Sequence, residues 1–303
     1  MKKIHFISIQ DTNTVSLLIA SKKIDYHLSI SDKKISPDFK EDLIKNDISF
    51  NEEWHPEQIT KNIDCVVLGT KVENNNPELL RAKLLNIKIF SLQQFINYLC
   101  TEKTRVLVAG TYGKTSVISI VMHVLKFHNF SVDHIINKKI SGIKSLISLS
   151  KENDFIIIEG NENILPEINE FSKDQFFNPH VVLITCVFWK YIKTYPSFES
   201  YKKYFNALID NIIPGGTLIH NINDQEINTL VNESIHTIRK ESYSNIKSEI
   251  INGIVTLETE EGNYPIKNHN DYSLINLGGA IWLCQLIGID HSDFYEAIIS
   301  YRG

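Results

Sequence analysis

The chain has 303 residues, of which 43% are hydrophobic and 22% charged, with a formal net charge of −5 at pH 7. This length allows one to three domains, and the composition is that of a globular protein rather than a disordered or fibrous one. An acidic balance without a basic run argues against binding of nucleic acid. No stretch reaches the ~18 apolar residues of a membrane span, and the apolar run at residues 4–9 is too short for a signal peptide, so we expect a cytoplasmic protein without membrane contact.

Cysteine and histidine spacing gives no sign of a metal centre or a disulfide framework. The cysteines are far apart and form no CxxC pair: Cys65, Cys100, Cys186 and Cys284. His123 and His128 are five residues apart, off the i, i+4 face that a helical metal pair uses. We therefore expect reduced thiols, and histidines that pack or lie on the surface.

Residues 1–101 alternate between short apolar runs and stretches with helical character. The runs lie at residues 4–9, 26–30, 65–68 and 87–90. Residues 77–85 are a predicted helix, because Asn76 is a good cap and Pro77 is suited to the first turn. Short strands joined by helices favour a parallel α/β sheet.

Residues 102–303 form a second α/β series after the polar stretch 101–104, where we place the domain boundary. Strands are expected at residues 105–109, 155–158, 181–187 and 217–220. Helices are expected at residues 197–213, 274–287 and 292–300, and residues 250–266 alternate around Glu261-Gly262-Asn263 like a hairpin. The predicted fold class is thus α/β in both domains.

The most informative segment, residues 106–116, reads Val-Leu-Val-Ala-Gly-Thr-Tyr-Gly-Lys-Thr-Ser and precedes an amphipathic stretch. A strand, a glycine-bearing turn and a helix start direct backbone N–H groups and the helix dipole at a phosphate. Lys114 adds a charge and Thr115 offers a ligand for Mg²⁺. Val108 stands where the ordinary P-loop pattern has glycine, so this loop is a variant. The alternative is a βα turn that merely contains Gly-Lys-Thr.

Residues 110–116 resemble the GTxGKT[ST] loop of the Mur ligases. Similarity to the members that act on UDP-N-acetylmuramate extends to several further segments, which are His5-Phe6-Ile7, Ser31-Asp32, residues 63–69, Asn76-Pro77-Glu78 and residues 293–298. The resemblance covers essentially the whole chain. It implies a Rossmann-like N-terminal domain for a UDP-sugar and a P-loop-type central domain for ATP, with a C-terminal domain for an amino acid or peptide. Such enzymes phosphorylate the muramoyl carboxylate with ATP and Mg²⁺, and an amine then displaces the phosphate.

The resemblance also implies the site residues. Those that would contact an adenine nucleotide are Gly110, Thr111, Gly113, Lys114, Thr115, Ser116 and Asn276. Lys114 and Glu159 are the candidate catalytic residues, because Lys114 would neutralise the β- and γ-phosphates and Glu159 would bind Mg²⁺ together with Thr115. Asn276 matches an asparagine near the adenine. For Glu159 the alternative is a solvated carboxylate at the end of a strand.

The segment after residue 184 departs from the family pattern TNxxxDHxD. Cys186 stands for the asparagine, Lys190 for the aspartate and Tyr191 for the histidine, and Lys193 replaces an acidic or amide residue. Lysine repels a hard cation, so this predicts a weakened Mg²⁺ site. The alternative is that Lys190 and Lys193 are solvated loop residues, or that Lys190 contacts phosphate.

Other positions also depart from the family. Gln10 and Asp11 replace glycines that would let the backbone approach a pyrophosphate, so we expect little or no binding of UDP-N-acetylmuramate. Asn161 replaces an acidic residue, and Tyr272-Ser273 occupies the place of a His-Asn pair. Residues 300–303 resemble the end of the central domain, which predicts that the C-terminal ligase domain is missing from this chain.

Two hypotheses follow from these matches and departures. In the first, the chain is a Mur-ligase-like nucleotide-binding protein whose catalysis is impaired or lost, and which acts through a protein partner. In the second, it is an active ATP-dependent UDP-N-acetylmuramate:peptide or L-alanine ligase whose last domain lies outside this chain. The intact apolar strands together with altered site residues favour the first.

Overall fold

The computed structural model describes residues 2–9, 12–70, 72–161, 177–189, 194–266 and 271–302, with the backbone alone at 271–273. The chain divides into two compact units. The first contains residues 1–102 and 145–153, and the second contains residues 103–144 and 154–303. The return of residues 145–153 to the first unit has no signal in the sequence; Lys151 there forms an ion pair of 2.6 Å with Asp25.

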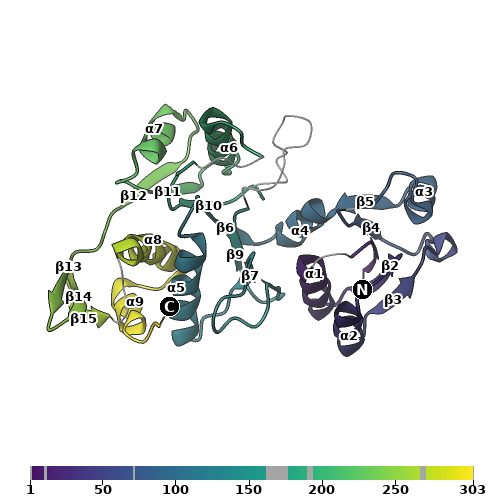
Figure 1. The fold of residues 1–303 in the computed structure, drawn as a ribbon, viewed down its shortest axis with the longest axis horizontal. Helices are drawn as coiled ribbons and strands as arrows, with labels where there is room; N and C mark the ends of the chain where they lie inside the picture. Colours follow the sequence, from purple (N-terminus) through teal and green to yellow (C-terminus); the bar gives the residue numbers. More distant parts are fainter. Residues whose placement is uncertain are drawn as a thin grey trace. The chain divides into compact units, whose positions relative to one another are not determined.

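The first unit is a parallel sheet with the strand order β3-β2-β1-β4-β5 (Figure 1). Its strands are β1 (Lys3–Ile7), β2 (His27–Asp32), β3 (Ser49–Glu52), β4 (Cys65–Leu68) and β5 (Lys88–Ser91). Its helices are α1 (Thr12–Lys23), α2 (Pro37–Lys45), the short 3₁₀ turn η1 (Pro56–Gln58), α3 (Pro77–Leu84) and α4 (Leu92–Cys100). The strand order reverses direction at β1, and doubly wound sheets bind ligands at the carboxyl ends of the strands flanking such a point.

Helix α3 begins as predicted from Asn76 and Pro77. The Asn76 side-chain oxygen accepts hydrogen bonds from the backbone N–H groups of Glu78, at 2.9 Å, and of Leu79, at 3.0 Å. Leu79 then packs in a core cluster with Ile7, Ile59, Val66, Ala82 and Ile87. The cap thus fixes the start of α3, and the buried apolar face fixes its orientation on the sheet.

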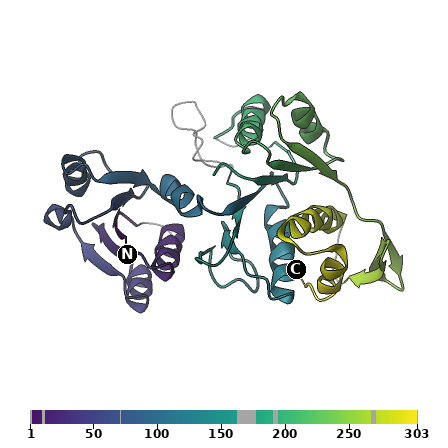
Figure 2. The ribbon, with the colours of Figure 1, turned by 180° about the vertical axis from the view of Figure 1, so that it is seen from behind.

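The second unit has a sheet with the order β12-β11-β10-β6-β9-β7, and all these pairings are parallel. The strands are β6 (Thr104–Ala109), β7 (Asp133–Ile135), β9 (Phe155–Glu159), β10 (Val181–Ile184), β11 (Thr217–Asn221) and β12 (Arg239–Tyr243), while β8 (Ile147–Ser148) belongs to the segment that returns to the first unit. The helices are α5 (Lys114–Phe127), α6 (Phe198–Asp210), α7 (Gln225–Glu233), α8 (Asp271–Ile287) and α9 (His291–Ile298). Helices α5, α8 and α9 lie on one face of this sheet and α6 and α7 on the other (Figure 2). The predicted α/β class is confirmed in both units.

Several predicted boundaries were too long. Strand β1 ends at Ile7 and β10 at Ile184, while α6 begins after its cap Ser197 and ends at Asp210. For β1 and β10 the apolar pattern continues past the last residue that pairs with a neighbouring strand. Ile9 and Val187 are buried although they do not belong to a strand. The apolar pattern of the sequence therefore overestimated the length of these strands.

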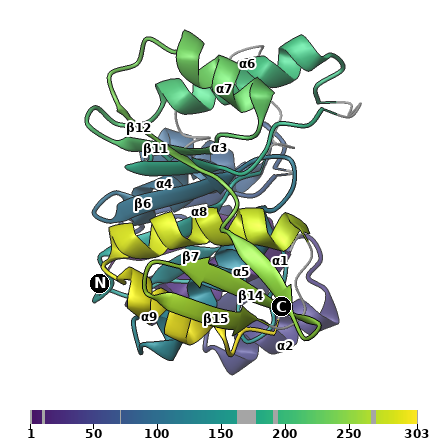
Figure 3. The same ribbon diagram turned by 90° about the vertical axis from the view of Figure 1, so that its left-hand side faces the viewer.

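A small antiparallel sheet contains the predicted hairpin and one further strand. It consists of β13 (Ser248–Ile251), β14 (Ile254–Thr259) and β15 (Gly262–Ile266), with β14 in the middle. The additional turn holds Asn252 and Gly253, both at positive φ, which is a sequence signal for a tight hairpin that the pattern analysis missed. The sheet lies beside α9 (Figure 3), where the rings of Tyr264 and Tyr295 stack at 4.9 Å.

His123 of α5 and His128, which caps the end of this helix, have packing roles. His123 Nε2 contacts the backbone oxygen of Ala297 and His128 Nε2 that of Asp293, at 3.0 and 2.8 Å, so both link α5 to α9. All four cysteines are free thiols. Within the described part of the chain, no helix is both long and apolar enough to cross a membrane.

Candidate functional site

The phosphate loop joins β6 to α5 in the second unit. Gly110 has φ of 126°, and a side chain there would meet Thr185 Oγ1 at 2.2 Å, so only glycine is accommodated. Gly113 is the cap residue of α5 at φ of 87°, without a capping side chain. The first turn of α5, which includes Thr115 and the exposed Ser116, therefore has backbone N–H groups that no cap satisfies.

Helix α8 brings Asn276 to this loop. A Cβ atom on Gly113 would lie 2.6 Å from Asn276 Oδ1, so these two residues, 163 positions apart, are in close contact. The same helix approaches the sheet closely at Gly278, where a Cβ atom would lie 2.5 Å from the backbone oxygen of Ser244. The structure thus places the predicted residues of the loop and of α8 at one location.

Lys114 lies in the first turn of α5 and its amino group folds back over the loop. Lys114 Nζ donates to the backbone oxygen of Gly110 at 2.5 Å. A lysine held beside a helix N-terminus combines a full positive charge with the partial charges of free N–H groups. This arrangement is suited to a phosphate group.

Thr115 and Glu159 are in direct contact. The Thr115 hydroxyl donates to Glu159 Oε1 at 2.6 Å, and the second carboxylate oxygen accepts the backbone N–H of Asn137 at 2.8 Å. Glu159 ends β9 and is 5% exposed, which contradicts the alternative of a solvated carboxylate. Asn137 was not identified from the sequence, because a lone asparagine after the short strand β7 carries no motif.

This pair is compatible with Mg²⁺, which commonly binds proteins through one or two oxygen ligands and the phosphates of a substrate. A hydroxyl and a carboxylate 2.6 Å apart supply hard oxygen ligands. Within the described residues there is no cluster of three or more His, Cys, Asp or Glu side chains that could hold a metal ion. In sites of this kind the remaining ligands of Mg²⁺ are phosphate oxygens of the substrate and water.

The segment after β10 is hydrogen-bonded to the phosphate loop. The backbone oxygen of Cys186 accepts the N–H of Thr111 at 2.9 Å, and its sulfur lies 3.3 Å from the N–H of Tyr112. Burial raises the pKa of the Cys186 thiol, so it remains protonated and is a poor ligand for a hard cation. Lys190, Tyr191 and Lys193, the other predicted departures, lie outside the described residues.

Thr111 and Asp224 hold this segment in place. The Thr111 hydroxyl is 2.8 Å from the Tyr201 hydroxyl and accepts the N–H of Phe188 at 2.9 Å. Asp224 accepts the N–H of Val187 at 2.9 Å and caps α7 with its other oxygen. Sequence analysis missed Asp224, although an aspartate directly before an amphipathic helix is a cap signal.

The first unit contains a cavity of about 450 Å³ at the carboxyl ends of β1 and β2. Its walls are formed by Ser8, Asp32, Lys33, Trp54, Val72, Glu73, Asn75, Asn76 and Pro77. Asp32 is buried and accepts the backbone N–H of Ile9 at 2.7 Å. Gln10 and Asp11, on which the expectation of weak UDP-sugar binding depends, lie outside the described residues.

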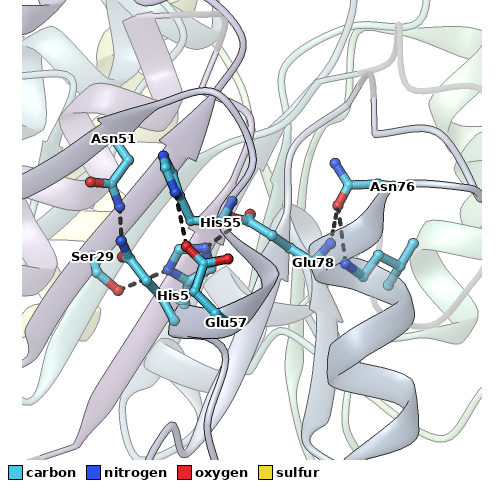
Figure 4. Close-up of polar contacts among 9 residues, drawn as sticks. His5, Ser29, Asn51, His55, Glu57, Asn76 and Glu78 are labelled. Atoms are coloured by element: carbon cyan, nitrogen blue, oxygen red, sulfur yellow. Dashed lines mark hydrogen bonds and ion pairs between the residues drawn. The ribbon is translucent and has the colours of Figure 1, made fainter.

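Two segments quoted above for the family resemblance meet beside this cavity (Figure 4). His5 Nε2 on β1 lies 3.2 Å from Glu78 Oε2 on α3, and these side chains are 1% and 0% exposed. His5 Nδ1 contacts the Ser29 hydroxyl at 2.8 Å, and Glu78 Oε1 accepts the backbone N–H of His55 at 2.8 Å. This buried pair and its two partners join four segments of the first unit: β1, β2, α3 and the segment that contains His55.

Comparison with known proteins identifies the family to which this arrangement belongs. The Mur ligase middle domain matches residues 108–281, more than half of the chain. The chain therefore belongs to the Mur ligase family, which confirms the resemblance found in the sequence.

Several of the similar proteins are named as ligases of UDP-N-acetylmuramate. A UDP-N-acetylmuramate–L-alanine ligase of Carboxydothermus hydrogenoformans is 24% identical, over all of this chain and 66% of its own length. The UDP-N-acetylmuramate:L-alanyl-gamma-D-glutamyl-meso-diaminopimelate ligase of Neisseria meningitides superposes with a TM-score of 0.80 at 17% identity, covering 100% of this chain and 99% of that one. The UDP-N-acetylmuramate-alanine ligase of Thermotoga maritima superposes with a TM-score of 0.66 at 20% identity, covering 100% and 69%. This chain thus spans about 66% of the length of the first of these relatives.

Proposed function

We propose that the second unit binds ATP, with the phosphates at residues 110–116 and Mg²⁺ held between Thr115 and Glu159. The proposal is supported most directly by the 2.6 Å contact between these two side chains, which are 44 positions apart. Asn276, which contacts the loop at Gly113, is proposed to lie near the adenine.

Each residue of the proposed site has a distinct task. Lys114 leaves the Gly110 carbonyl and neutralises the β- and γ-phosphates, while the N–H groups at the start of α5 bind their oxygens. Thr115 and Glu159 would hold the cation through their oxygens, with the Thr115 hydroxyl proton turned away from the Glu159 carboxylate to which it donates here. Mg²⁺ would supply further neutralisation of the phosphate charge.

The reaction class that we propose for the family fold is activation of a muramoyl carboxylate by ATP, followed by attack of an amine. We further propose that catalysis is impaired in this chain, because Cys186, Lys190 and Tyr191 replace an amide, an acid and an imidazole of the family pattern. In phosphoryl transfer, the loss of one electrostatic contributor typically costs on the order of 10²-fold in rate. The alternative remains an active UDP-N-acetylmuramate:peptide or L-alanine ligase.

For the first unit we propose weak or no binding of UDP-N-acetylmuramate. The cavity is lined by the carboxylates of Asp32 and Glu73 and by one lysine, Lys33, which disfavours a diphosphate. Thermal-shift titration with UDP-N-acetylmuramate tests this directly. Clear stabilisation at sub-millimolar concentration would contradict it and favour the ligase alternative.

Nucleotide binding is tested by isothermal calorimetry of the chain with ATP, with and without Mg²⁺. We expect a dissociation constant on the order of micromolar to millimolar, which Mg²⁺ lowers. Absence of binding by the wild-type chain would contradict the proposal.

Impaired catalysis is tested by phosphate release in the presence of ATP, Mg²⁺, UDP-N-acetylmuramate and L-alanine or a peptide. We expect little release from the wild-type chain and more from the variant Cys186→Asn/Lys190→Asp/Tyr191→His, which restores three of the four altered positions of the family pattern. Rapid release by the wild-type chain would show that the ligase alternative is correct.

A further inference from the structure

The buried pair formed by His5 and Glu78 connects parts of the first unit that also form its cavity. Glu78 follows Asn76 and Pro77, which line the cavity, and His55 follows Trp54, which lines it as well. The hydrogen bond of 2.8 Å from the His55 N–H to Glu78 Oε1 therefore links these two walls (Figure 4). His5 lies on β1, three residues before Ser8, which also lines the cavity.

We propose that Glu78, held in place by His5, is a positioning residue that sets the distance between the Trp54 wall and the Asn76 wall of this cavity. The inference concerns the first unit alone and does not depend on nucleotide binding in the second. It also gives a physical reason why the two segments that resemble the family, residues 5–7 and 76–78, occur in the same chain. His5 of the first segment contacts Glu78 of the second.

The charge state of Glu78 follows from its surroundings. Burial alone would raise the pKa of its carboxyl group, but hydrogen bonds from His5 and from the His55 N–H more than offset this effect and lower the pKa. The position of Glu78 in the first turn of α3 also favours a negative charge. Both oxygens of the carboxylate can only accept hydrogen bonds, so His5 carries a proton on Nε2.

A role in positioning is distinct from a role in stability. A buried polar pair is often no more stabilising than apolar side chains of similar volume, because both groups lose their hydration. What the pair provides is direction, since the two carboxylate oxygens accept from donors on different segments, His5 on β1 and the His55 N–H. An apolar replacement fills the same space but leaves the two walls unlinked.

Trp54 offers a spectroscopic measure of this geometry. It is partly buried against the core cluster that includes Leu79 of α3. The other tryptophans, Trp189 and Trp282, belong to the second unit, so Trp189→Phe/Trp282→Phe leaves Trp54 as the single reporter. The emission maximum of Trp54 and its quenching by acrylamide then report how exposed the Trp54 wall of the cavity is to solvent.

The decisive comparison is Glu78→Leu against Glu78→Gln in this single-tryptophan background, with the nearby exposed Glu57→Gln as matched control. For Glu78→Leu we expect a red shift of Trp54 emission, stronger quenching and about fivefold to tenfold faster hydrogen exchange of the His55 amide. For Glu78→Gln and Glu57→Gln we expect no shift, because the His55 N–H keeps its acceptor. A folded Glu78→Leu variant with unchanged Trp54 emission and quenching would overturn the proposal.

Glu78→Gln provides a second measurement that does not require Glu78→Leu to fold. If its amide oxygen keeps the His55 N–H, its NH₂ group faces His5 Nε2, which must then accept. The His5 proton moves to Nδ1 and is donated to the Ser29 hydroxyl, 2.8 Å away. Nitrogen NMR shifts of the imidazole ring should show this change of tautomer, and a proton that stays on Nε2 would contradict the proposed link.

Discussion

Among the residues that the structure describes, each unit buries one glutamate beside hydrogen-bond donors, Glu78 in the first and Glu159 in the second, and the two sets of donors differ in what they can do. Glu78 in the first unit is bound by an imidazole ring and a backbone N–H, both fixed by packing. Glu159 in the second unit is bound by a backbone N–H and by the hydroxyl of Thr115. A hydroxyl can rotate and present a lone pair instead of its proton. Glu159 can therefore exchange a partner for a cation, whereas Glu78 cannot without breaking its surroundings.

This difference predicts that removal of the Glu78 carboxylate lowers the free energy of unfolding more than removal of the Glu159 carboxylate does. Glu78→Ala leaves His5 and the His55 N–H without an acceptor in a buried environment, and each buried donor left unsatisfied typically costs about 1–3 kcal/mol of unfolding free energy. Urea unfolding monitored by circular dichroism measures this loss. Glu159→Ala is the comparison, and an equal loss for both variants would contradict the distinction.

The acid side of the stability curve gives a related test. Because the pKa of Glu78 is lowered in the folded state, its contribution is present above the unfolded pKa of about 4.3 and is lost as the pH falls through the folded pKa. The groups facing it are His5 on β1, with His55 and Glu57 near η1. We expect the wild-type chain to lose more stability between about pH 5 and pH 3 than Glu78→Gln does. Parallel curves would contradict this.

In the second unit the largest expected effect is on ligand affinity rather than on folding. Lys114→Ala removes the only side-chain charge that the proposed site directs at the β- and γ-phosphates from α5, so we expect about 10- to 100-fold weaker ATP binding. Calorimetry measures the change. Lys126→Ala, in the last turn of the same helix, is the control and should bind like the wild type. Equal affinity of both variants would exclude the phosphate loop as the binding site.

Much of the fold could be predicted because each signal was local. The apolar runs of β4 and β9, the cap of α3 and the strand-loop-helix pattern at residues 104–127 depend on neighbours in the sequence. The missed elements are those whose identity depends on distant contacts. Strand β12 has the pattern Arg-Lys-Glu-Ser-Tyr, which is polar because only its last residue is buried. Its pairing with β11 could not be read from that pattern.

The candidate site was predictable to a similar extent. The motif identified Lys114, Thr115 and Glu159 as a group, and the structure brings Thr115 and Glu159 into contact. Asn137 and Asp224 could not be found in this way, because each makes a hydrogen bond to a distant segment: the Asn137 N–H donates to Glu159, and Asp224 accepts the N–H of Val187. The pairing of His5 with Glu78 was likewise hidden, although both had been noted in matching segments. A sequence pattern identifies residues but not which of them touch.

The loop geometry is tested by two glycines that share a backbone conformation. Gly113 has φ of 87° and Gly215 has φ of 78°, so alanine costs about 1–2 kcal/mol of stability at either position. Only at Gly113 would the new Cβ atom meet Asn276, at 2.6 Å, whereas nothing lies within 4 Å at Gly215. We therefore expect similar melting temperatures but weaker ATP binding for Gly113→Ala alone. Weaker binding by Gly215→Ala as well would mean that affinity follows general stability.

The smallest expected effect concerns Asn137, whose backbone and side chain act separately on the end of β9. Its backbone N–H holds Glu159 Oε2, and its side-chain amide donates to the backbone oxygen of Gly160 at 3.2 Å. Asn137→Ala removes only the side-chain contacts, to Gly160 and at 3.5 Å to the backbone oxygen of Glu159, worth about 1 kcal/mol in all. The Glu159 carboxylate keeps its two donors but loses part of its alignment.

We expect this variant to require about fivefold more Mg²⁺ to reach half of the Mg²⁺-dependent gain in ATP affinity, while binding without Mg²⁺ is unchanged. The matched control is Asn211→Ala, which removes a similar bond of 2.8 Å from a side-chain amide to the backbone oxygen of Ala207 in α6. A calorimetric titration of both variants over a range of Mg²⁺ concentrations separates the two cases. If Asn137→Ala weakens ATP binding equally with and without Mg²⁺, Asn137 supports the loop as a whole. Cation binding would then not depend on how Asn137 orients Glu159. The proposed difference between Glu159, which exchanges a partner for a cation, and the fixed carboxylate of Glu78 would lose its support.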